Sequence, residues 1–260
     1  MKKILSVFLV IFLAIIVYFG VTSYPKLDLI SGFSAKSIAS AHFIDGRDLP
    51  TIEAQDNNID LVKLAKNTLF SSQNYATSSV YGLKQRKAIF RPGLGAVLID
   101  DTFDCKAPYL TPKRDLTSIN LPYPLGNLEP KDTLFPEINY NKLQTGITKT
   151  FGFENAKNKN TRAVVVLYKN KLVGEKYANG FTKDNKFLGW SMTKSLTATY
   201  FGILQKQGKI DLNERNLFKE WLDDDRKNIT INDLLHMNSG LKWEEDYTKI
   251  SDVTKMLFLD

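Results

Sequence analysis

Cysteine and histidine are scarce in this chain. Among its 260 residues there is one cysteine, Cys105, and there are two histidines, His42 and His236. A lone cysteine cannot form an intrachain disulfide, which excludes a disulfide-stapled fold. Two histidines cannot supply a His-rich zinc site. The composition therefore predicts no bound metal, and no motif predicts a cofactor.

Low-complexity tracts and blocks of one charge are also missing. Lysine and arginine number 35 against 28 aspartates and glutamates, which gives a net charge of +7. The lysines are scattered and form no basic stripe interleaved with aromatic residues, so nucleic acid is not an expected partner. A modest positive charge suits a protein beside an anionic membrane surface. The 43% share of hydrophobic residues is typical of a globular protein.

A long apolar run is present at the N-terminus. Lys2 and Lys3 precede the segment 4–21, which only Ser6, Tyr18 and Gly20 interrupt. At about 1.5 Å per residue the segment spans roughly 27 Å, close to the thickness of a bilayer core. Residues 1–25 are therefore predicted to form a membrane anchor, with everything after it on the periplasmic or extracellular side. A cleaved signal peptide of an exported protein is the alternative, although no clean small-x-small cleavage site follows.

The next part, residues 26–160, has short apolar runs broken by proline, glycine and asparagine. It shows no sustained helical period, which predicts an N-terminal extension made of short strands. Residues 87–100 are typical of two strands around Pro92 and Gly93. Four prolines in residues 111–131 predict an extended surface strap.

Residues 161–260 are more regular. Residues 163–168 and 172–177 are two β-prone runs around a short turn, which predicts a hairpin. Apolar residues then recur at helical spacing, which predicts a helix from near Ser191 to Gly208. A second helix is predicted to begin with Thr230 as its N-cap and to end before Gly240.

Ser191 and Lys194 form a Ser-x-x-Lys motif at the start of the first predicted helix. Residues three apart share one helical turn, so the amine can lie beside the hydroxyl. A neutral amine can take the proton of a serine hydroxyl and make it a nucleophile. Unpaired amides at a helix N-terminus would favour negative charge developing on a substrate oxygen.

The tetrapeptide alone is not specific. Ser23 with Lys26 and Ser239 with Lys242 have the same spacing, but Pro25 and Gly240 argue that neither pair enters a helix. For Ser191 the alternative role is that of a helix N-cap, and for Lys194 that of a solvated surface lysine.

Three blocks follow one another in the second half of the chain: GWSMTKS at 189–195, GKIDLNE at 208–214 and ITINDLLHMNSGL at 229–241. In this order they resemble the serine β-lactamase and penicillin-binding-protein superfamily. Within it, the chain looks most like the class C-related branch of esterases and 6-aminohexanoate-dimer-type hydrolases. The stretch at 32–48 resembles the N-terminal extension of that branch.

The resemblance implies an α+β fold of the β-lactamase/transpeptidase type, an antiparallel sheet with a helical subdomain. It also implies that Ser191 attacks an amide or ester carbonyl of a small-molecule or peptide-like substrate while Lys194 takes the proton. Water would then release the acyl group from the serine.

The sequence departs from the family after the serine. A Tyr-x-Asn or Tyr-x-Ser element and a Lys-x-Gly or His-x-Gly strand are expected there, and neither can be placed. Tyr168 to Asn170 and Tyr177 to Asn179 precede Ser191, and Lys206 to Gly208 lies at a predicted helix end. We therefore expect residues 161–260 to be an incomplete, truncated domain with weak activity or none. The alternative is a non-catalytic, membrane-tethered protein that binds a peptide, a cell-wall fragment or a protein partner.

The remaining candidate residues are assigned no chemistry. His42 and His236 are expected to be structural, Trp190 to pack, and residues 223–225 to form a solvated turn. Cys105 has no placed partner and receives no role.

Overall fold

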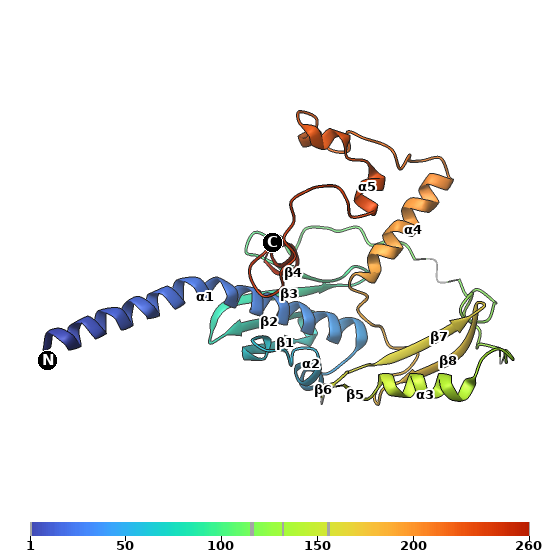
Figure 1. Ribbon diagram of the computed structural model, residues 1–260, viewed down its shortest axis with the longest axis horizontal. Coiled ribbons are helices and arrows are strands. Elements are labelled where there is room, and N and C mark those ends of the chain that lie inside the picture. Colours follow the sequence, from blue (N-terminus) through green and yellow to red (C-terminus); the bar gives the residue numbers. More distant parts are fainter. Residues whose placement is uncertain (1, 115–116, 132, 155–156, 260) are drawn as a thin grey trace. The chain divides into compact units, whose positions relative to one another are not determined.

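The computed structural model describes residues 2–114, 117–131, 133–154 and 157–259 (Figure 1). It divides into two compact units, residues 1–186 and 187–260. The predicted hairpin lies in the first unit and the Ser-x-x-Lys motif in the second. The domain boundaries at 25 and 160 stay predictions.

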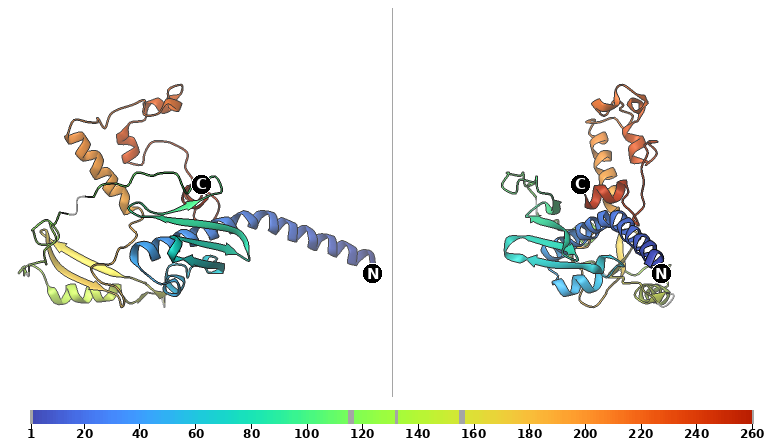
Figure 2. Two further views of the ribbon diagram at one scale, coloured as in Figure 1. Left: turned by 180° about the vertical axis from the view of Figure 1, so that it is seen from behind. Right: turned by 90° about the vertical axis from the view of Figure 1, so that its left-hand side faces the viewer.

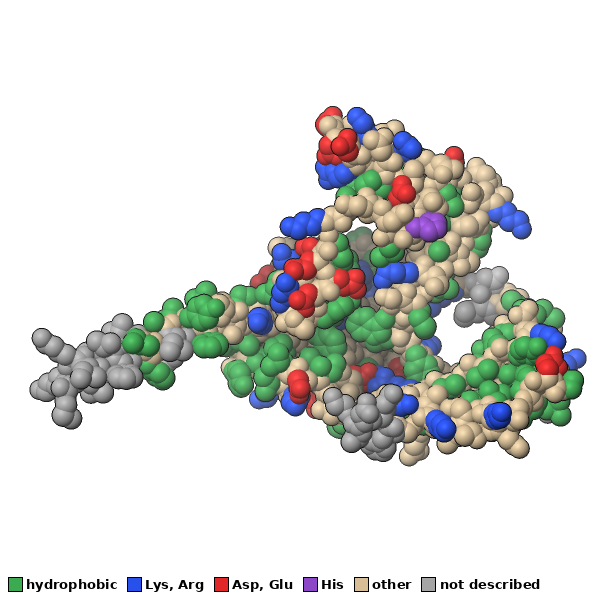
Figure 3. Space-filling model, in the orientation of Figure 1, with side chains coloured by type: hydrophobic (Ala, Val, Ile, Leu, Met, Phe, Trp, Pro, Cys, Tyr) green, Lys and Arg blue, Asp and Glu red, His purple; other side chains and the backbone are tan. Residues whose placement is uncertain are grey.

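The first unit begins with a long helix, α1 (Lys2–Asp45). Its N-terminal part exposes apolar side chains such as Phe12 and Val21. Hydrophobic side chains, coloured green, are visible along this helix in Figure 3. The helix is long and apolar enough to be a membrane span or a signal sequence. The helix does not end at residue 25, the predicted end of the anchor. It continues through Pro25 to Asp45.

The prediction that residues 26–160 lack a sustained helix was therefore wrong. Small residues and Ile38 recur at helical spacing over the second half of α1, and each is completely buried: Ser31, Ser34, Ala35, Ile38 and Ala39. Because two residues of this buried stripe are serines, a search for apolar residues at helical spacing does not detect it. Their small side chains let the helix approach a sheet closely, and this packing supports a helix that loses one backbone donor at Pro25.

The sheet is an antiparallel meander in the order β1 (Ala65–Phe70), β2 (Tyr75–Val80), β3 (Leu83–Arg91) and β4 (Gly95–Ile99). In register, Ala76 of β2 pairs with Ala88 of β3, and Ala88 pairs with Leu98 of β4. Helix α1 lies along one face of this sheet (Figure 2). The two strands predicted around Pro92 are confirmed as β3 and β4.

Polar side chains link α1 to the sheet. Ser34 donates to the Asn67 side-chain oxygen at 2.7 Å, and Ser78 donates to the same oxygen at 2.6 Å. Asn57 donates to the Ser34 hydroxyl at 2.8 Å. The Ser34 hydroxyl therefore has partners on both sides and costs little to bury. The Ser31 hydroxyl of the same stripe is buried without a hydrogen-bond partner among the described residues.

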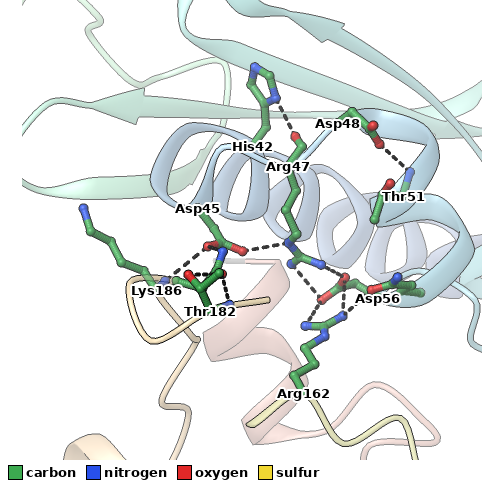
Figure 4. A network of polar contacts seen from close by, with 11 residues as sticks. His42, Asp45, Arg47, Asp48, Thr51, Asp56, Arg162, Thr182 and Lys186 are labelled. Carbon is green, nitrogen blue, oxygen red and sulfur yellow. Dashed lines mark hydrogen bonds and ion pairs between the residues drawn. The ribbon is translucent and has the colours of Figure 1, made fainter. Parts of the chain in front are cut away.

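A second polar network ties the end of α1 to residues far along the chain (Figure 4). Asp56 follows the short helix α2 (Leu49–Gln55) and accepts hydrogen bonds from both Arg47 and Arg162. Asp45, the last residue of α1, accepts from the Asn185 side chain at 3.0 Å and from the Lys186 amide at 3.1 Å. The network therefore joins the helix end to both sides of the hairpin segment.

The predicted hairpin is confirmed as β7 (Ala163–Tyr168) and β8 (Lys171–Tyr177). Helix α3 (Tyr140–Thr150) packs on β8 and buries Ile147. A Cβ at Gly174 would lie 2.7 Å from the terminal methyl of Ile147, so a larger residue at this position would force the Ile147 side chain to shift. The shorter elements of this unit are η1 (Val62–Leu64), η2 (Ser71–Gln73), β5 (Phe153–Glu154) and β6 (Lys157–Asn158). In the described part of residues 111–131 there is no helix or named strand, as a strap requires.

The second unit is made of helices. Both predicted helices are confirmed, as α4 (Met192–Lys206) and as α5 (Ile231–Leu235) with Thr230 as N-cap. Gly208 takes a positive φ of 68° just after α4, the conformation that commonly ends a helix. The other elements are η3 (Lys219–Trp221), η4 (Asp225–Asn228) and α6 (Asp252–Phe258).

Candidate functional site

Ser191 and Lys194 lie side by side at the start of α4. Ser191 occupies the N-cap position and Lys194 the first turn. The Lys194 ammonium nitrogen Nζ donates a hydrogen bond to the Ser191 hydroxyl oxygen Oγ at 2.8 Å. The spacing of three residues thus brings the two groups into direct contact, as the helix geometry requires.

The Ser191 side chain does not cap the helix. It makes no hydrogen bond to a backbone amide of the first turn, and its backbone is already helical, with φ −64° and ψ −9°. A capping serine has an extended backbone and accepts from an amide two or three residues on. The alternative role of Ser191 as an N-cap is therefore not supported by this geometry.

The turn before the serine is strained and held by local bonds. Trp190 has a positive φ of 42°, which is unfavourable for a bulky residue. Thr193 donates to the Trp190 carbonyl through both its amide, at 3.1 Å, and its hydroxyl, at 2.7 Å. Thr193 therefore positions the turn that presents Ser191. The sequence reasoning missed this role, for which the only signal was a hydroxyl residue inside the motif.

The sequence predicted unpaired backbone amides at the start of this helix, but most of these amides have hydrogen-bond partners. Those of Met192, Thr193 and Lys194 donate to the carbonyls of Gly189, Trp190 and Ser191. Only the Ser191 amide, among these four and within the described residues, has no recorded partner. Any developing oxyanion would thus have one free backbone donor here.

The site is open to solvent. Ser191 and Lys194 are exposed, and α4 has no buried residue. Apolar side chains on α4 remain in water, with Leu196 57% and Tyr200 62% exposed. Trp190, expected to pack, is also exposed at 56%. A cavity of about 1010 Å³ lies in the same unit, but residues 242–256 line it rather than the motif.

The other two serine–lysine pairs differ from this one. Ser23 and Lys26 do lie within a helix, α1, contrary to the expectation based on Pro25. Ser239 and Lys242 lie outside the helices of the second unit, as expected. Among the described residues only Lys194 has a recorded bond to the serine three positions before it.

The histidines are used in local hydrogen bonds. His42 contacts the Arg47 carbonyl through Nδ1 at 2.8 Å and the Ser71 hydroxyl through Nε2 at 3.1 Å. His236 contacts the Asn232 carbonyl at 2.9 Å. Across the described ranges no group of three His, Cys, Asp or Glu side chains is placed to hold a metal ion.

Residues 223–225 lie in an exposed turn, as expected. Asp224 accepts from the Arg226 side chain at 2.7 Å. Hydrogen bonds from the Arg226 side chain and then from its backbone lower the pKa of Asp224 to about 2. This local pair holds the turn and offers no metal site.

The Beta-lactamase family model matches residues 154–256, a stretch that includes the hairpin, α4 and the motif. No curated protein and no solved structure matches the chain. The family match supports the serine β-lactamase and penicillin-binding-protein superfamily and, in general terms, an enzyme of the serine hydrolase type. The mixture of helices and antiparallel sheets fits an α+β fold.

Proposed function

We propose that this chain carries the nucleophile and base of a serine hydrolase that cleaves amide or ester bonds, with Ser191 and Lys194 in those roles. The single observation that carries the proposal is the 2.8 Å contact between Lys194 Nζ and Ser191 Oγ at the start of α4. The Beta-lactamase match over the same segment supports it independently.

The chemistry proposed for the pair is acyl transfer. The Ser191 oxygen attacks the substrate carbonyl carbon while its proton passes to the neutral amine of Lys194. The C–N or C–O bond then breaks, and the leaving group takes up the proton. Water hydrolyses the acyl-serine ester, which releases a carboxylic acid and restores Ser191. The Ser191 amide is the local donor for the oxyanion of both steps.

We place the enzyme in the class C-related branch that holds esterases and 6-aminohexanoate-dimer-type hydrolases. The blocks at 208–214 and 229–241 support this branch. The apolar N-terminal half of α1 supports attachment to a membrane, with the hydrolase segment on the periplasmic or extracellular side.

We expect acylation to be slow in this chain. Both side chains are exposed, whereas burial is what favours a neutral amine. Lys206 to Gly208 lies at the end of α4 and not on a strand, so it does not serve as the family's Lys-x-Gly element. Among the described amides of this turn only that of Ser191 is free for the oxyanion, and the lack of one oxyanion donor typically lowers the rate about 10²- to 10³-fold.

Covalent labelling tests the proposal. The purified full chain in detergent is treated with a fluorophosphonate and, separately, with a fluorescent penicillin, and the labelled residue is located by mass spectrometry. We expect slow labelling at Ser191 and none in Ser191→Ala. Ser195→Ala is the matched control, because Ser195 lies on the same exposed helix and receives no recorded bond from a lysine.

The outcomes distinguish a serine hydrolase from a non-catalytic, membrane-tethered protein. Labelling that survives in Ser191→Ala contradicts the assignment of the nucleophile. No labelling by either reagent in a folded chain contradicts the hydrolase and favours the non-catalytic, membrane-tethered protein. Labelling by the penicillin as well as by the fluorophosphonate would point to amide-like substrates, because the penicillin reacts through a lactam.

A further inference from the structure

A cavity of about 560 Å³ lies in the first unit, and no residue of the serine–lysine motif lines it. Its volume is within the range of small-molecule sites, about 300–1,000 Å³. Strands β2 and β3 form one wall, and the segment after β4 forms the other. The side chains that bear on the argument are Tyr75, Lys87, Arg91, Phe103, Asp104 and Tyr109.

The cavity lies on the sheet face that α1 does not cover. In β3, Ala88 is completely buried and Phe90 stacks on Phe43 of α1 with ring centroids 5.3 Å apart. Successive side chains of a strand point to opposite faces. Lys87 and Arg91 therefore stand together on the other face, where the segment 103–109 meets them.

Among the described residues, aromatic rings and not an acid contact the Arg91 guanidinium. Its guanidinium carbon lies 5.5 Å from the ring centre of Tyr109 and 6.0 Å from that of Phe103. Its Nε atom is buried without a hydrogen-bond partner, and the described residues give it no ion pair. A buried donor on a charged group is costly to leave unpaired, so an acceptor that enters the cavity would relieve that cost.

Lys87 adds a second cation in the same way. Its ammonium nitrogen lies 4.1 Å from the ring centre of Tyr75, and within the described ranges it has no recorded ion pair. The one carboxylate of the lining, Asp104, accepts from the Lys106 amide at 2.8 Å. The cavity wall thus keeps a net positive charge next to exposed aromatic surface.

We infer that this cavity binds an organic anion, a carboxylate or phosphate group carried on a flat apolar body. Arg91 offers paired N–H donors, which suit a planar carboxylate or a phosphate, and Lys87 offers a point charge. Cation–π contacts hold both cations without neutralising them, so the ligand supplies the counter-charge. The rings of Tyr109 and Phe103 supply the surface for its apolar body.

Cys105 provides a direct readout. It is the only cysteine of the chain, it is exposed, and it lines the cavity. Its rate of alkylation by iodoacetamide, a neutral reagent, is measured on the full chain in detergent with three additives. 2-Naphthoate carries both the ring and the charge, 2-naphthamide carries the ring without the charge, and acetate carries the charge without the ring.

We expect 2-naphthoate to slow the alkylation of Cys105 and the other two additives to leave it unchanged at the same concentration. Arg91→Gln should weaken the protection about tenfold or more in naphthoate concentration, because a charge-assisted contact is lost. Lys87→Gln should weaken it less and serves if Arg91→Gln does not fold. Lys66→Gln is the control, because Lys66 is exposed on β1 of the same sheet and does not line the cavity.

Four results would overturn the inference. They are equal protection by the amide, protection that persists in both Arg91→Gln and Lys87→Gln, loss of protection in Lys66→Gln, and no protection in a folded chain. Phenyl phosphate in place of 2-naphthoate distinguishes a phosphate from a carboxylate as the preferred group. Protection by phosphatidylglycerol vesicles without protection by either soluble anion would also reject a ligand cavity, in favour of contact with a membrane surface.

Discussion

Helices α1 and α4 both carry apolar side chains at helical spacing, yet they end in different environments. The second half of α1 buries Ala35, Ile38 and Ala39 completely against the sheet. Helix α4 buries none of its residues. A helix can therefore be specified by local sequence signals without a buried face. The proposed reactive pair, Ser191 and Lys194, needs only the geometry of one helical turn.

The contact between Ser191 and Lys194 is local in this sense. Three residues and one helical turn are enough to bring the amine to the hydroxyl at 2.8 Å. What packing would add is burial, which favours the neutral form of an amine and excludes water. The two side chains are therefore in contact, but they lack the buried environment that favours fast catalysis.

The largest effect is expected at Lys194, and it tests whether the local pair suffices. Lys194→Met should lower the rate of fluorophosphonate labelling at Ser191 about 10²- to 10⁴-fold, the usual range for general base catalysis. The rate is measured by gel fluorescence against time. Lys206→Met, at the last turn of the same helix, should label like the wild type. A normal rate in Lys194→Met would show that the contact has no chemical role.

The next effect compares the two helices by stability. Ile38→Ala should lower the free energy of unfolding by about 2–5 kcal/mol, because it leaves a cavity between α1 and the sheet. Chemical denaturation followed by far-UV circular dichroism measures it. The same truncation in α4, Ile203→Ala, should cost less than about 1 kcal/mol, since that side chain is already 47% exposed. Equal losses in the two variants would remove the contrast between the helices.

A smaller effect, with a pH dependence, is expected at Asp56. Burial by itself would raise the pKa of Asp56, but hydrogen bonds from Arg47 and Arg162 outweigh it and lower the pKa below its ordinary value. Asp56→Asn should destabilise the chain by about 1–3 kcal/mol at neutral pH, the worth of hydrogen bonds to a charged group.

The sign of the pH effect follows from the lowered pKa. The stabilisation is complete above the unfolded-state pKa of about 4 and is lost as the pH falls through the folded-state value. Denaturation of wild type and Asp56→Asn at pH 7 and in acid should therefore converge as the pH decreases. Asp60→Asn is the control, because that carboxylate is exposed and its ion pair with Lys63 lies at the surface. A gap between wild type and Asp56→Asn that does not change with pH would contradict this account.

The smallest effect is confined to the second unit. The Asp224 carboxyl should titrate near pH 2, which NMR of the side-chain carbon can follow. Arg226→Gln should return its pKa toward the ordinary value of about 3.9, without a measurable change in unfolding free energy, because the pair is exposed. A titration of Asp224 that Arg226→Gln leaves in place would show that another group holds the carboxylate.

Much of the second half of the chain could be predicted because its signals are local. The β-branched run before Tyr168, the cap at Thr230 and the glycine at 208 each act within a few residues, and each marks an element that the structure contains. The Ser191 and Lys194 contact could be predicted for the same reason. The strained Trp190 turn could not, because no local preference favours a positive φ at tryptophan.

The helix over residues 26–45 could not be predicted from apolar periodicity. Its buried stripe contains serines, and Ser34 is tolerable there only because Asn57 and Asn67, which lie far along the chain, satisfy its hydroxyl. The cavity is a similar case. Lys87 and Arg91 alternate along one strand in the sequence, but only the segment 103–109 makes that face a cavity.

The amino-acid sequence by itself determined which residues share a helical turn, where the hairpin bends and which segment is apolar enough for a membrane, because these depend on neighbours a few positions apart. Tertiary structure alone decided which polar groups are buried and satisfied, which face of the sheet α1 covers and which cations remain without a partner. Those outcomes depend on contacts between distant residues, and a buried charge or hydroxyl is stable only where such contacts supply its partner.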